Sequence, residues 1–517
     1  MNHRSRREFL SDVGQGMLIG ALGSSVSLEL GLSSAFADDP AERLTFGALE
    51  PLVSLLQETS PDKLLPLLVA KLNTGTDLKT LVAAAALANA RAFGGQDYTG
   101  YHTFMALGPA YQIAAELPEQ RQALPVLKVL YRNSSRIQEQ GFHHRDALHP
   151  VSPATSVDNG QAGEQLRQAV RAVDREGAET CFAALARGPI GEAYNHLQFE
   201  IQDEVDVHRV VLSWRAWAML GLTGEAHAHT LLRQSVQYCL DTEQRMRDND
   251  YPRSDVRRVL PRLLDEHHLL GKTLGDRAAE DRWVEALAET IFSGSRDQAA
   301  DAAAGALAEG MDPEAVGEAI SLAANMLVLH DPGRLKQYST PGKPPGCVHG
   351  DSVGVHASDA SNAWRNISRV GNPRNRVASL IVGAYHTAGQ MDRVTKDRYP
   401  YAEALDELDA TEVEPLLAQA EEAIKANDQA RACAVVHRYG ELELPARPVF
   451  DLLVKYAVSE DGALHAEKFY RTVVEEFAAT RPAFRWRQLV ALARVTASEH
   501  GFPAPGYQES CDLLGVS

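Results

Sequence analysis

Apolar residues recur every third or fourth position along most of this chain, which is the spacing of one face of an α-helix. The clearest segments with this spacing are 64–72, 78–93, 124–138, 209–222 and 315–329. Glycine and proline separate such segments, at Pro118, Gly141, Gly160, Gly188, Gly224, Gly310, Pro373 and Gly440. The alternation typical of β-strands is scarce. The pattern therefore predicts an all-α fold.

Two distant stretches repeat one another at matching internal spacing. Tyr101-His102 and Val355-His356 each open a predicted helix, and a tyrosine follows each histidine at the same separation, Tyr131 and Tyr385 respectively. Upstream, a Gly-x-Asp motif precedes an alanine-rich helix in both copies. This agreement predicts that a whole helical unit was duplicated.

Two weaker copies complete the pattern. Val207-His208 opens a helix that leads to Tyr238, and Leu464-His465 opens one in the last part of the chain, where Arg494 takes the place of the tyrosine. The four units span about 60–145, 165–245, 297–395 and 412–505. Units of this kind bury their apolar faces against their neighbours. We therefore expect one domain over residues 38–517, a curved or closed α-helical array of the α-toroid type.

The repeated histidines are the main candidates for chemistry: His102, His208, His356 and His465. If the units face one centre, their imidazoles converge and suit Zn, Fe, Cu or Ni. Carboxylates nearby in sequence, at Asp206, Asp359 and Glu467, are expected to act as ligands or to orient the imidazoles. The alternative is that each histidine only caps its helix or holds the preceding loop, and recurs because the unit was copied.

Other histidines give weaker signals. A Gly/Pro-rich insertion in the third unit places His349 and Asp351 shortly before His356, and these two are the second choice as ligands. The loop 142–150 carries His143, His144 and His149, a tract that hints at metal or at a solvated connector. The pairs His227/His229 and His267/His268 lack the i, i+4 spacing that would put both rings on one helical face.

The N-terminus predicts export. Ser5-Arg6-Arg7-Glu8-Phe9-Leu10 resembles the twin-arginine motif, an apolar run follows, and Ala35-Phe36-Ala37 offers a cleavage site. The apolar run contains Ser24 and Glu29 and is too polar to span a membrane. We expect cleavage after Ala37, passage through the twin-arginine export machinery, and a periplasmic or secreted protein. This route resembles that of proteins that fold around a cofactor before export.

Composition excludes some classes of function. The formal net charge is -18, and nucleic-acid binding needs a basic face. The five cysteines are scattered without a C-x-x-C pair, so neither a disulfide framework nor a thiolate metal site is expected. Glycine-rich nucleotide-binding motifs are missing from the sequence.

The order of exported leader, Gly-Tyr-His102 helix, Asp-Val-His208 helix, Gly-Val-His356 helix and Ala-Leu-His465-Ala-Glu-Lys-Phe helix is similar to that of an uncharacterised bacterial family of helical proteins. The stretch His102-Thr-Phe-Met-Ala-Leu-Gly resembles questin-oxidase-like proteins, which implies an oxidative reaction.

Three functions stay open at this point. The first is a metal- or cofactor-dependent oxidoreductase. The second is an α-toroid polysaccharide lyase or hydrolase that uses His and Tyr as acid and base. The third is a non-catalytic repeat scaffold that binds another protein. The sequence does not decide whether the protein is an enzyme.

Overall fold

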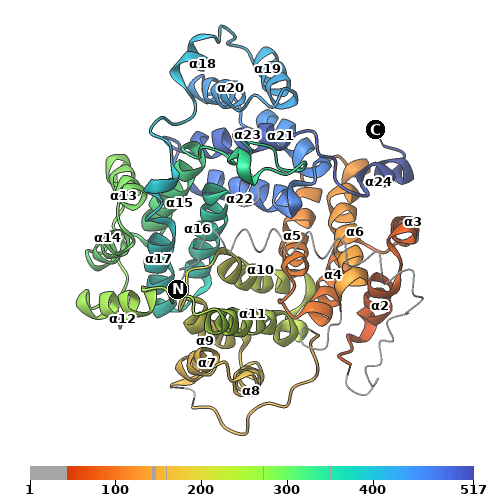
Figure 1. Ribbon diagram of the computed structural model, residues 1–517, viewed down its shortest axis with the longest axis vertical. Helices are drawn as coiled ribbons and strands as arrows, with labels where there is room; N and C mark the ends of the chain where they lie inside the picture. Colours follow the sequence, from red (N-terminus) through yellow and green to blue (C-terminus); the bar gives the residue numbers. More distant parts are fainter. Residues whose placement is uncertain (1–42, 142–146, 159, 272, 349–351, 517) are drawn as a thin grey trace. The chain divides into compact units, whose positions relative to one another are not determined.

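Helices make up almost all the regular structure of this protein (Figure 1). The computed structural model describes residues 43–141, 147–158, 160–271, 273–348 and 352–516. Within these ranges the only β-type pairing is three isolated bridges. The predicted all-α fold is confirmed. The predicted leader and cleavage site lie outside the described residues, and export stays a prediction.

The first half of the chain carries helices in this order: α2 (Glu50–Glu58), α3 (Pro61–Asn73), α4 (Leu78–Phe93), α5 (Tyr98–Ala114), α6 (Ala123–Gln140), α7 (Ala162–Ala172), α8 (Arg175–Leu185), α9 (Ile190–Ile201), α10 (Val207–Thr223), α11 (Ala228–Asp248) and α12 (Val256–Glu266). The second half continues with α13 (Asp281–Ser293), α14 (Arg296–Ala308), α15 (Pro313–Leu329), α16 (Val353–Val370), α17 (Pro373–Thr387), α18 (Ala402–Asp406), α19 (Val413–Lys425), α20 (Gln429–Glu441), α21 (Arg447–Ser459), α22 (Ala466–Ala479), α23 (Trp486–Glu499) and α24 (Tyr507–Leu514).

Local sequence explains where these helices begin and end. Asp77 caps α4 by accepting a hydrogen bond from the Thr80 backbone N–H at 2.6 Å, and Gly94 ends it in the left-handed conformation. Between these two residues α4 is alanine-rich and buried on all sides. Because alanine favours the helix and has a small side chain, neighbouring helices can approach α4 closely.

Four helices contact one another in a closed circuit. α5 packs on α10, α10 on α16, α16 on α22, and α22 returns to α5. Each of the four also packs on the helix before it and the helix after it, from α4 and α6 around α5 to α21 and α23 around α22. Figure 1 shows the four around the middle of residues 44–517. We call them the central helices. Their origin by duplication stays a prediction.

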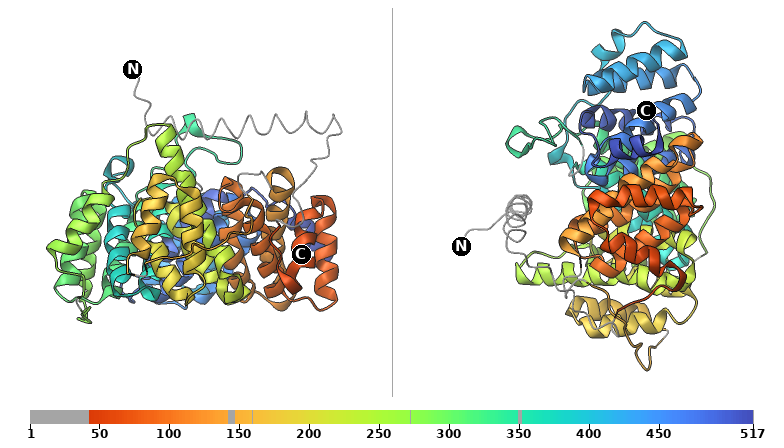
Figure 2. Two further views of the ribbon diagram at one scale, coloured as in Figure 1. Left: turned by 90° about the horizontal axis from the view of Figure 1, so that it is seen from below. Right: turned by 90° about the vertical axis from the view of Figure 1, so that its right-hand side faces the viewer.

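The circuit closes because the C-terminal helices pack on the first ones. The second of the two apolar clusters is formed mainly by α19 to α23, and it also includes Ile113 of α5, Leu124 of α6 and Val355 of α16. The side views in Figure 2 show the last helices beside the first. The two ends of the folded chain are therefore held together by buried apolar surface.

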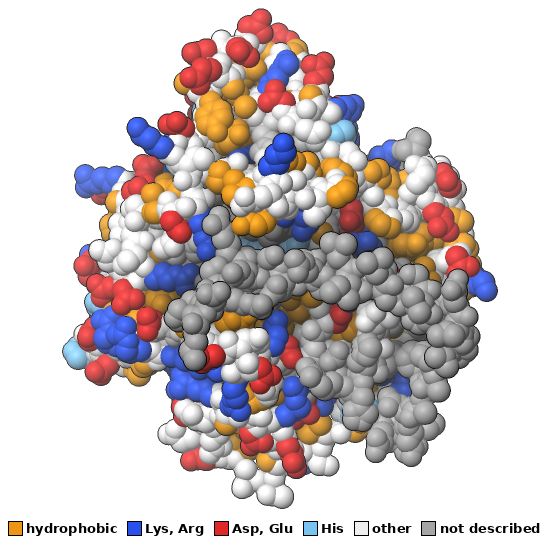
Figure 3. Space-filling view, in the orientation of Figure 1, with side chains coloured by type: hydrophobic (Ala, Val, Ile, Leu, Met, Phe, Trp, Pro, Cys, Tyr) orange, Lys and Arg blue, Asp and Glu red, His pale blue; other side chains and the backbone are white. Residues whose placement is uncertain are grey.

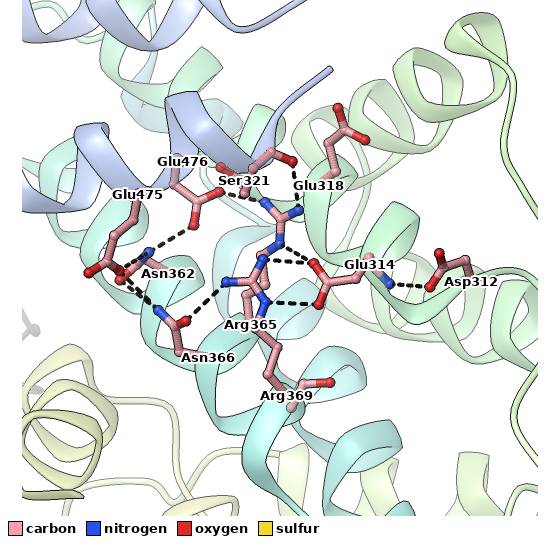
Figure 4. Close-up of polar contacts among 12 residues, drawn as sticks. Asp312, Glu314, Glu318, Ser321, Asn362, Arg365, Asn366, Arg369, Glu475 and Glu476 are labelled. Atoms are coloured by element: carbon pink, nitrogen blue, oxygen red, sulfur yellow. Dashed lines mark hydrogen bonds and ion pairs between the residues drawn. The ribbon is translucent and has the colours of Figure 1, made fainter. Parts of the chain in front are cut away.

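A buried polar network joins α15, α16 and α22 along the circuit (Figure 4). Arg365 donates to Glu476 at 2.7 Å and to Glu314 at 3.2 Å, so one guanidinium connects all three helices. Asn362 donates to Glu475 and to Glu476 at 3.1 and 2.9 Å. Paired charges with this many hydrogen bonds fix the relative position of helices more than they add stability. The network therefore sets how α16 and α22 lie side by side.

Pro373 marks the break between α16 and α17 as predicted, whereas the break predicted at Gly440 is wrong. Pro373 is the first residue of α17, where its missing N–H is tolerated. Gly440 lies inside α20, where an added Cβ would come within 2.6 Å of the Trp486 ring. Gly440 therefore lets α20 pack closely against Trp486. Local sequence does not reveal this contact, because the two residues are far apart in the chain.

Two further expectations can be compared with the described residues. All five cysteines are free and buried, which agrees with the expectation that they form no disulfide framework. Within the described ranges, no helix has both the length and the apolar character needed to cross a bilayer.

His229 in α11 gives a pH-dependent stability. Burial, and secondarily the charge of Arg233, lower its pKa to about 4, and its ring stacks on Phe182. Because the pKa is lower in the folded state than in the unfolded chain, the unfolded chain binds the extra proton. His229 should therefore remove about 1–2 kcal/mol of stability as the pH falls from 7 to 5. Urea unfolding at both pH values should show this loss reduced in His229→Leu and retained in His267→Leu. An equal loss in wild type and His229→Leu would contradict the assignment.

Candidate metal centre

The four repeated histidines meet at the N-terminal ends of the central helices. The ring centroids of His102 and His208 lie 4.8 Å apart, and those of His208 and His356 lie 5.6 Å apart. The circuit continues from His356 to His465 at 5.4 Å and returns from His465 to His102 at 5.0 Å. Each ring therefore contacts two others. We call these four rings the histidine centre.

The convergence follows from where each histidine stands on its helix. His208 and His356 lie in the first turns of α10 and α16, His102 lies just after the first turn of α5, and His465 is the N-cap of α22. Since the four helices begin at the same place in the circuit, their first turns point their side chains at one another.

Local hydrogen bonds hold the Nδ1 side of three rings. His102 Nδ1 lies 2.7 Å from the Tyr98 carbonyl, and His465 Nδ1 lies 3.1 Å from the Ala463 carbonyl. His208 Nδ1 lies 3.4 Å from Asp206 Oδ1. A neutral imidazole bonded in this way carries its proton on Nδ1 and leaves a lone pair on Nε2.

The Nε2 atoms of His102, His208 and His356 are buried and have no hydrogen-bond partner among the described residues. A buried polar atom without a partner costs about 1–3 kcal/mol, and such atoms are rare in folded proteins. The alternative considered from the sequence, that each histidine only caps its helix or holds a loop, explains the Nδ1 contacts. It does not explain why the Nε2 atoms are buried without a hydrogen-bond partner among the described residues.

The centre keeps His102 and His356 uncharged. Burial lowers the pKa of His102 well below its usual value, and the nearby Lys468 ammonium and His208 ring lower it further. Burial does the same for His356, with His208 and Lys468 again contributing. Both imidazoles are therefore neutral near pH 7, which is the form that binds metal.

Lys468 is a charged member of the site that sequence reasoning missed. It lies one turn after His465 on α22 and is 2% exposed, and burial lowers its pKa to about 8. Asp359, one turn after His356 on α16, is the largest influence opposing that shift and accepts a hydrogen bond from Thr472 at 2.8 Å. The sequence contained a signal for both charged residues. Lys468 follows His465, and Asp359 follows His356, at the i+3 spacing that places two side chains on one face of a helix.

The side of the centre formed by α5, α10 and α11 is lined by three tyrosines, Tyr98, Tyr101 and Tyr238. The ring of Tyr101 lies 5.0 Å from that of His102 and 5.3 Å from those of His208 and Tyr238. Tyr238 donates to Asp206 at 2.6 Å. Hydrogen bonds from His208 and Tyr238 and the charge of His208 outweigh burial and hold the pKa of Asp206 far below its usual value. Asp206 is thus ionised and orients His208, as its sequence position predicted.

Backbone geometry at the centre is tight. An added Cβ on Gly100 would come within 2.6 Å of the Phe93 ring, and one on Gly354 within 2.4 Å of the Val328 backbone. Each glycine stands two residues before a histidine of the centre, so α5 and α16 can begin directly against their neighbours. Ahead of His465, Ala463 and Leu464 adopt positive φ angles of 43° and 66°. Such strain in non-glycine residues is typical of functional sites.

Two of the four histidines have partly exposed side chains. His102 and His465 are buried, whereas His208 and His356 are half-buried and the neighbouring Tyr98 is 41% exposed. Figure 3 shows charged side chains of both signs interspersed over the described surface in the view of Figure 1.

One further expectation, that Glu467 serves the histidines, differs from the structure. Glu467 pairs with the buried Lys128 at 2.6 Å, so it does not serve the histidines. Tyr131 packs beside Gly506, and Tyr385 lies under the Arg296 guanidinium. Among the tyrosines repeated at matching positions, only Tyr238 has a ring or hydrogen-bond contact at the centre within the described residues. Arg494 donates instead to backbone carbonyls of Val328 and Asp331.

The second-choice ligands His349 and Asp351, and the loop histidines His143 and His144, lie outside the described residues. Within the described part of the chain, no set of three or more His, Cys, Asp or Glu side chains is placed so that it could hold a metal ion. The histidine rings are therefore neighbours without being a formed coordination site.

No protein-family model matches this chain, and neither a curated protein nor a solved structure is significantly similar to it. The resemblance to questin-oxidase-like proteins stays untested. The case for a function therefore depends on the chemistry of the histidine centre.

Proposed function

We propose that the histidine centre binds one transition-metal ion and that the protein is a metal-dependent oxidoreductase. The observation that carries this proposal is the closed circuit of four imidazoles, in which three buried Nε2 atoms have no partner among the described residues. A metal ion can satisfy several such lone pairs at once.

The ring separations are compatible with this ligand. Imidazoles that bind a common ion through nitrogen at about 2.1 Å have neighbouring ring centroids about 5 Å apart, and the four measured separations run from 4.8 to 5.6 Å. Metal binding then requires the rings to turn so that their Nε2 atoms point at one centre. Small ring rotations of this kind are side-chain motions that need no change in the helices.

The groups that contact the Nδ1 atoms also support metal binding. Metal-bound histidines usually donate their second N–H to a backbone carbonyl or a carboxylate, which fixes the ring and raises its basicity. The Tyr98 and Ala463 carbonyls and the Asp206 carboxylate stand in those positions for His102, His465 and His208.

The proposed chemistry is oxidative because of the ligand set and its neighbours. Imidazole ligands suit Fe and Cu as well as Zn, and because each binds a metal as an uncharged group they leave the ion its full positive charge. Tyr98 and Tyr101 lie against the rings of His102 and His208, where a phenol can donate a proton to a bound substrate. The half-buried side at His208 and His356 would admit a small molecule.

Elemental analysis of the protein exported with its own leader tests the proposal. We expect about one Fe or Cu per chain, and a melting temperature that falls on chelation because the ion stabilises only the folded state. Finding zinc alone would contradict the oxidative chemistry. Finding no metal, together with no binding when the apoprotein is titrated with Fe, Cu or Zn, would overturn the proposal as a whole.

A further inference from the structure

The Nε2 atoms of the histidine centre need a route of entry for any ligand. Those of His102, His208 and His356 are each buried. An ion or a small molecule can therefore reach them only if a covering segment moves. The helices that carry the rings belong to a closed, packed circuit, which opens less readily than a connection on the surface. The part that moves must therefore be a connection near the starts of these helices.

The connection between α15 and α16 lies beside the centre. It is described over residues 330–348 and leads to α16, whose first turn carries His356. Burial lowers the pKa of His356 most, and the charge of Lys343 in this connection contributes to the same shift. Burial lowers the pKa of Lys343 in turn, and the Asp461 carboxylate opposes that shift. Since Asp461 lies just before His465, Lys343 is near the starts of both α16 and α22.

Residues 335–345 of this connection, which we call the tip, form a self-contained unit. Thr340 and Lys343 exchange backbone hydrogen bonds at 3.0 and 2.9 Å around a Pro-Gly turn, and the Tyr338 N–H donates to the Leu335 carbonyl at 2.9 Å. Among the described residues, the backbone hydrogen bonds of the tip stay within the connection. Figure 2 shows the connection projecting from the neighbouring helices in both views. The tip can therefore move as one body.

A narrow neck joins the tip to the body of the protein. The Arg334 N–H donates to the Cys347 carbonyl and the Gly346 N–H donates to the Arg334 carbonyl, both at 2.9 Å. Gly333 and Gly346 have positive φ angles of 75° and 81°, which glycine adopts without strain. Below the neck, Cys347 and Val348 are buried. The neck is thus fixed at its base and can bend at its glycines.

We propose that the tip is a gate to the histidine centre, which swings on its neck and admits an ion or a small substrate to the buried Nε2 atoms. The gate regulates access to the site of the proposed function, and it rests on that function only for the identity of what enters. Lys343 is the half-buried side chain that holds the tip toward the centre.

Modification of the mature apoprotein with diethyl pyrocarbonate tests the gate without any metal. The reagent acylates neutral imidazoles that it can reach, and mass spectrometry gives the rate at each histidine. When Gly-Gly replaces residues 335–345, His356 should react at least about tenfold faster than in wild type, because a minor open state is usually populated at about 10% or less. The shortened chain can close as a two-residue hairpin, since the Arg334 carbonyl already accepts from the Gly346 N–H.

Two histidines far from the gate are references within the same molecule. His229 of α11 has a buried Nε2 atom and should stay slow, whereas His267 is partly exposed beside Asp301 and should keep its rate. A faster reaction at His229 would show that the shortened variant unfolds, and the point variants then decide.

Two point variants loosen the tip without removing it. Lys343→Gln should raise the rate at His356 at least about threefold, because a weaker contact makes local opening more frequent. Lys336→Gln is the matched control, since Lys336 is exposed on the same tip, and it should leave the rate unchanged. A wild-type rate at His356 in Lys343→Gln and in the folded shortened variant would overturn the gate. If the shortened variant unfolds, a wild-type rate in Lys343→Gln overturns it alone.

Zn²⁺ exchange separates this inference from the proposed function. Zn²⁺ should enter and leave the shortened variant faster than wild type, with an affinity changed by less than about twofold, because a gate that supplies no ligand alters the rates and not the equilibrium. If Zn²⁺ binds to neither protein while the histidine rates behave as expected, the metal proposal fails and the gate stands. If Zn²⁺ binds and the histidine rates do not change, the metal proposal stands and the gate is wrong.

Discussion

Replacing Lys128 by methionine is expected to lower the free energy of unfolding by about 3–5 kcal/mol. Lys128 of α6 is fully buried, as is its partner Glu467 of α22, and their charged atoms lie 2.6 Å apart. The ammonium also donates to the carbonyls of Ala457 and Glu460 at 3.0 and 2.5 Å. Without the lysine, the Glu467 carboxylate stays buried with no cation beside it. Urea denaturation measures the loss.

The double variant Lys128→Met/Glu467→Leu is the control for this interpretation. It removes both charges and should recover at least half of the stability lost in Lys128→Met, because an apolar pair of similar volume replaces a buried ion pair at little cost. If the double variant is as unstable as the single one, the lysine acts through packing and not through the carboxylate. Glu467 lies two residues after His465, so the pair also fixes the start of α22 at the centre.

His102→Ala and His356→Ala should each weaken metal binding by at least about 100-fold, since even the partners that orient a ligand contribute about 10- to 100-fold. These two histidines belong to different helices on opposite sides of the circuit, with His208 and His465 between them. Competition titration with a chelator of known affinity measures the change.

His267→Ala is the matched control for metal binding. Its ring pairs with Asp301 between α12 and α14, away from the central helices, and its loss should leave metal affinity unchanged. The apoprotein of His102→Ala should lose some stability, because the buried ring leaves a cavity and its Nδ1 contact with the Tyr98 carbonyl is lost, so metal affinity is compared under conditions where each variant is folded. A metal affinity equal to wild type in both variants would contradict the assignment of the ligands.

The sequence predicted the helices and the candidate histidines because both depend on local patterns. Apolar spacing indicates α4, α6, α10 and α15 to within a few residues of their observed ends. Three of the four histidines follow a Gly-x or Asp-x pair, which indicates a position at a helix start. These signals require only neighbouring residues on one helix.

The rest of the site depends on contacts between distant segments. Whether α22 returns to α5, and so brings His465 to His102, is decided by apolar packing of the C-terminal helices on α5 and α6. The role expected of Glu467 was wrong for the same reason, because its partner Lys128 is far away in the sequence. Its neighbour Lys468 acts on the histidines, while Glu467 points to a lysine of α6 that no local pattern connects to it.

X-ray absorption at the metal edge, on metal-loaded protein, tests the central claim most directly. The account predicts a first shell dominated by nitrogen at about 2.0–2.1 Å, with the multiple-scattering pattern of three or four imidazoles, reduced by one imidazole in His356→Ala. A shell of oxygen alone, a sulfur shell, or an imidazole count that does not change in His356→Ala would contradict it.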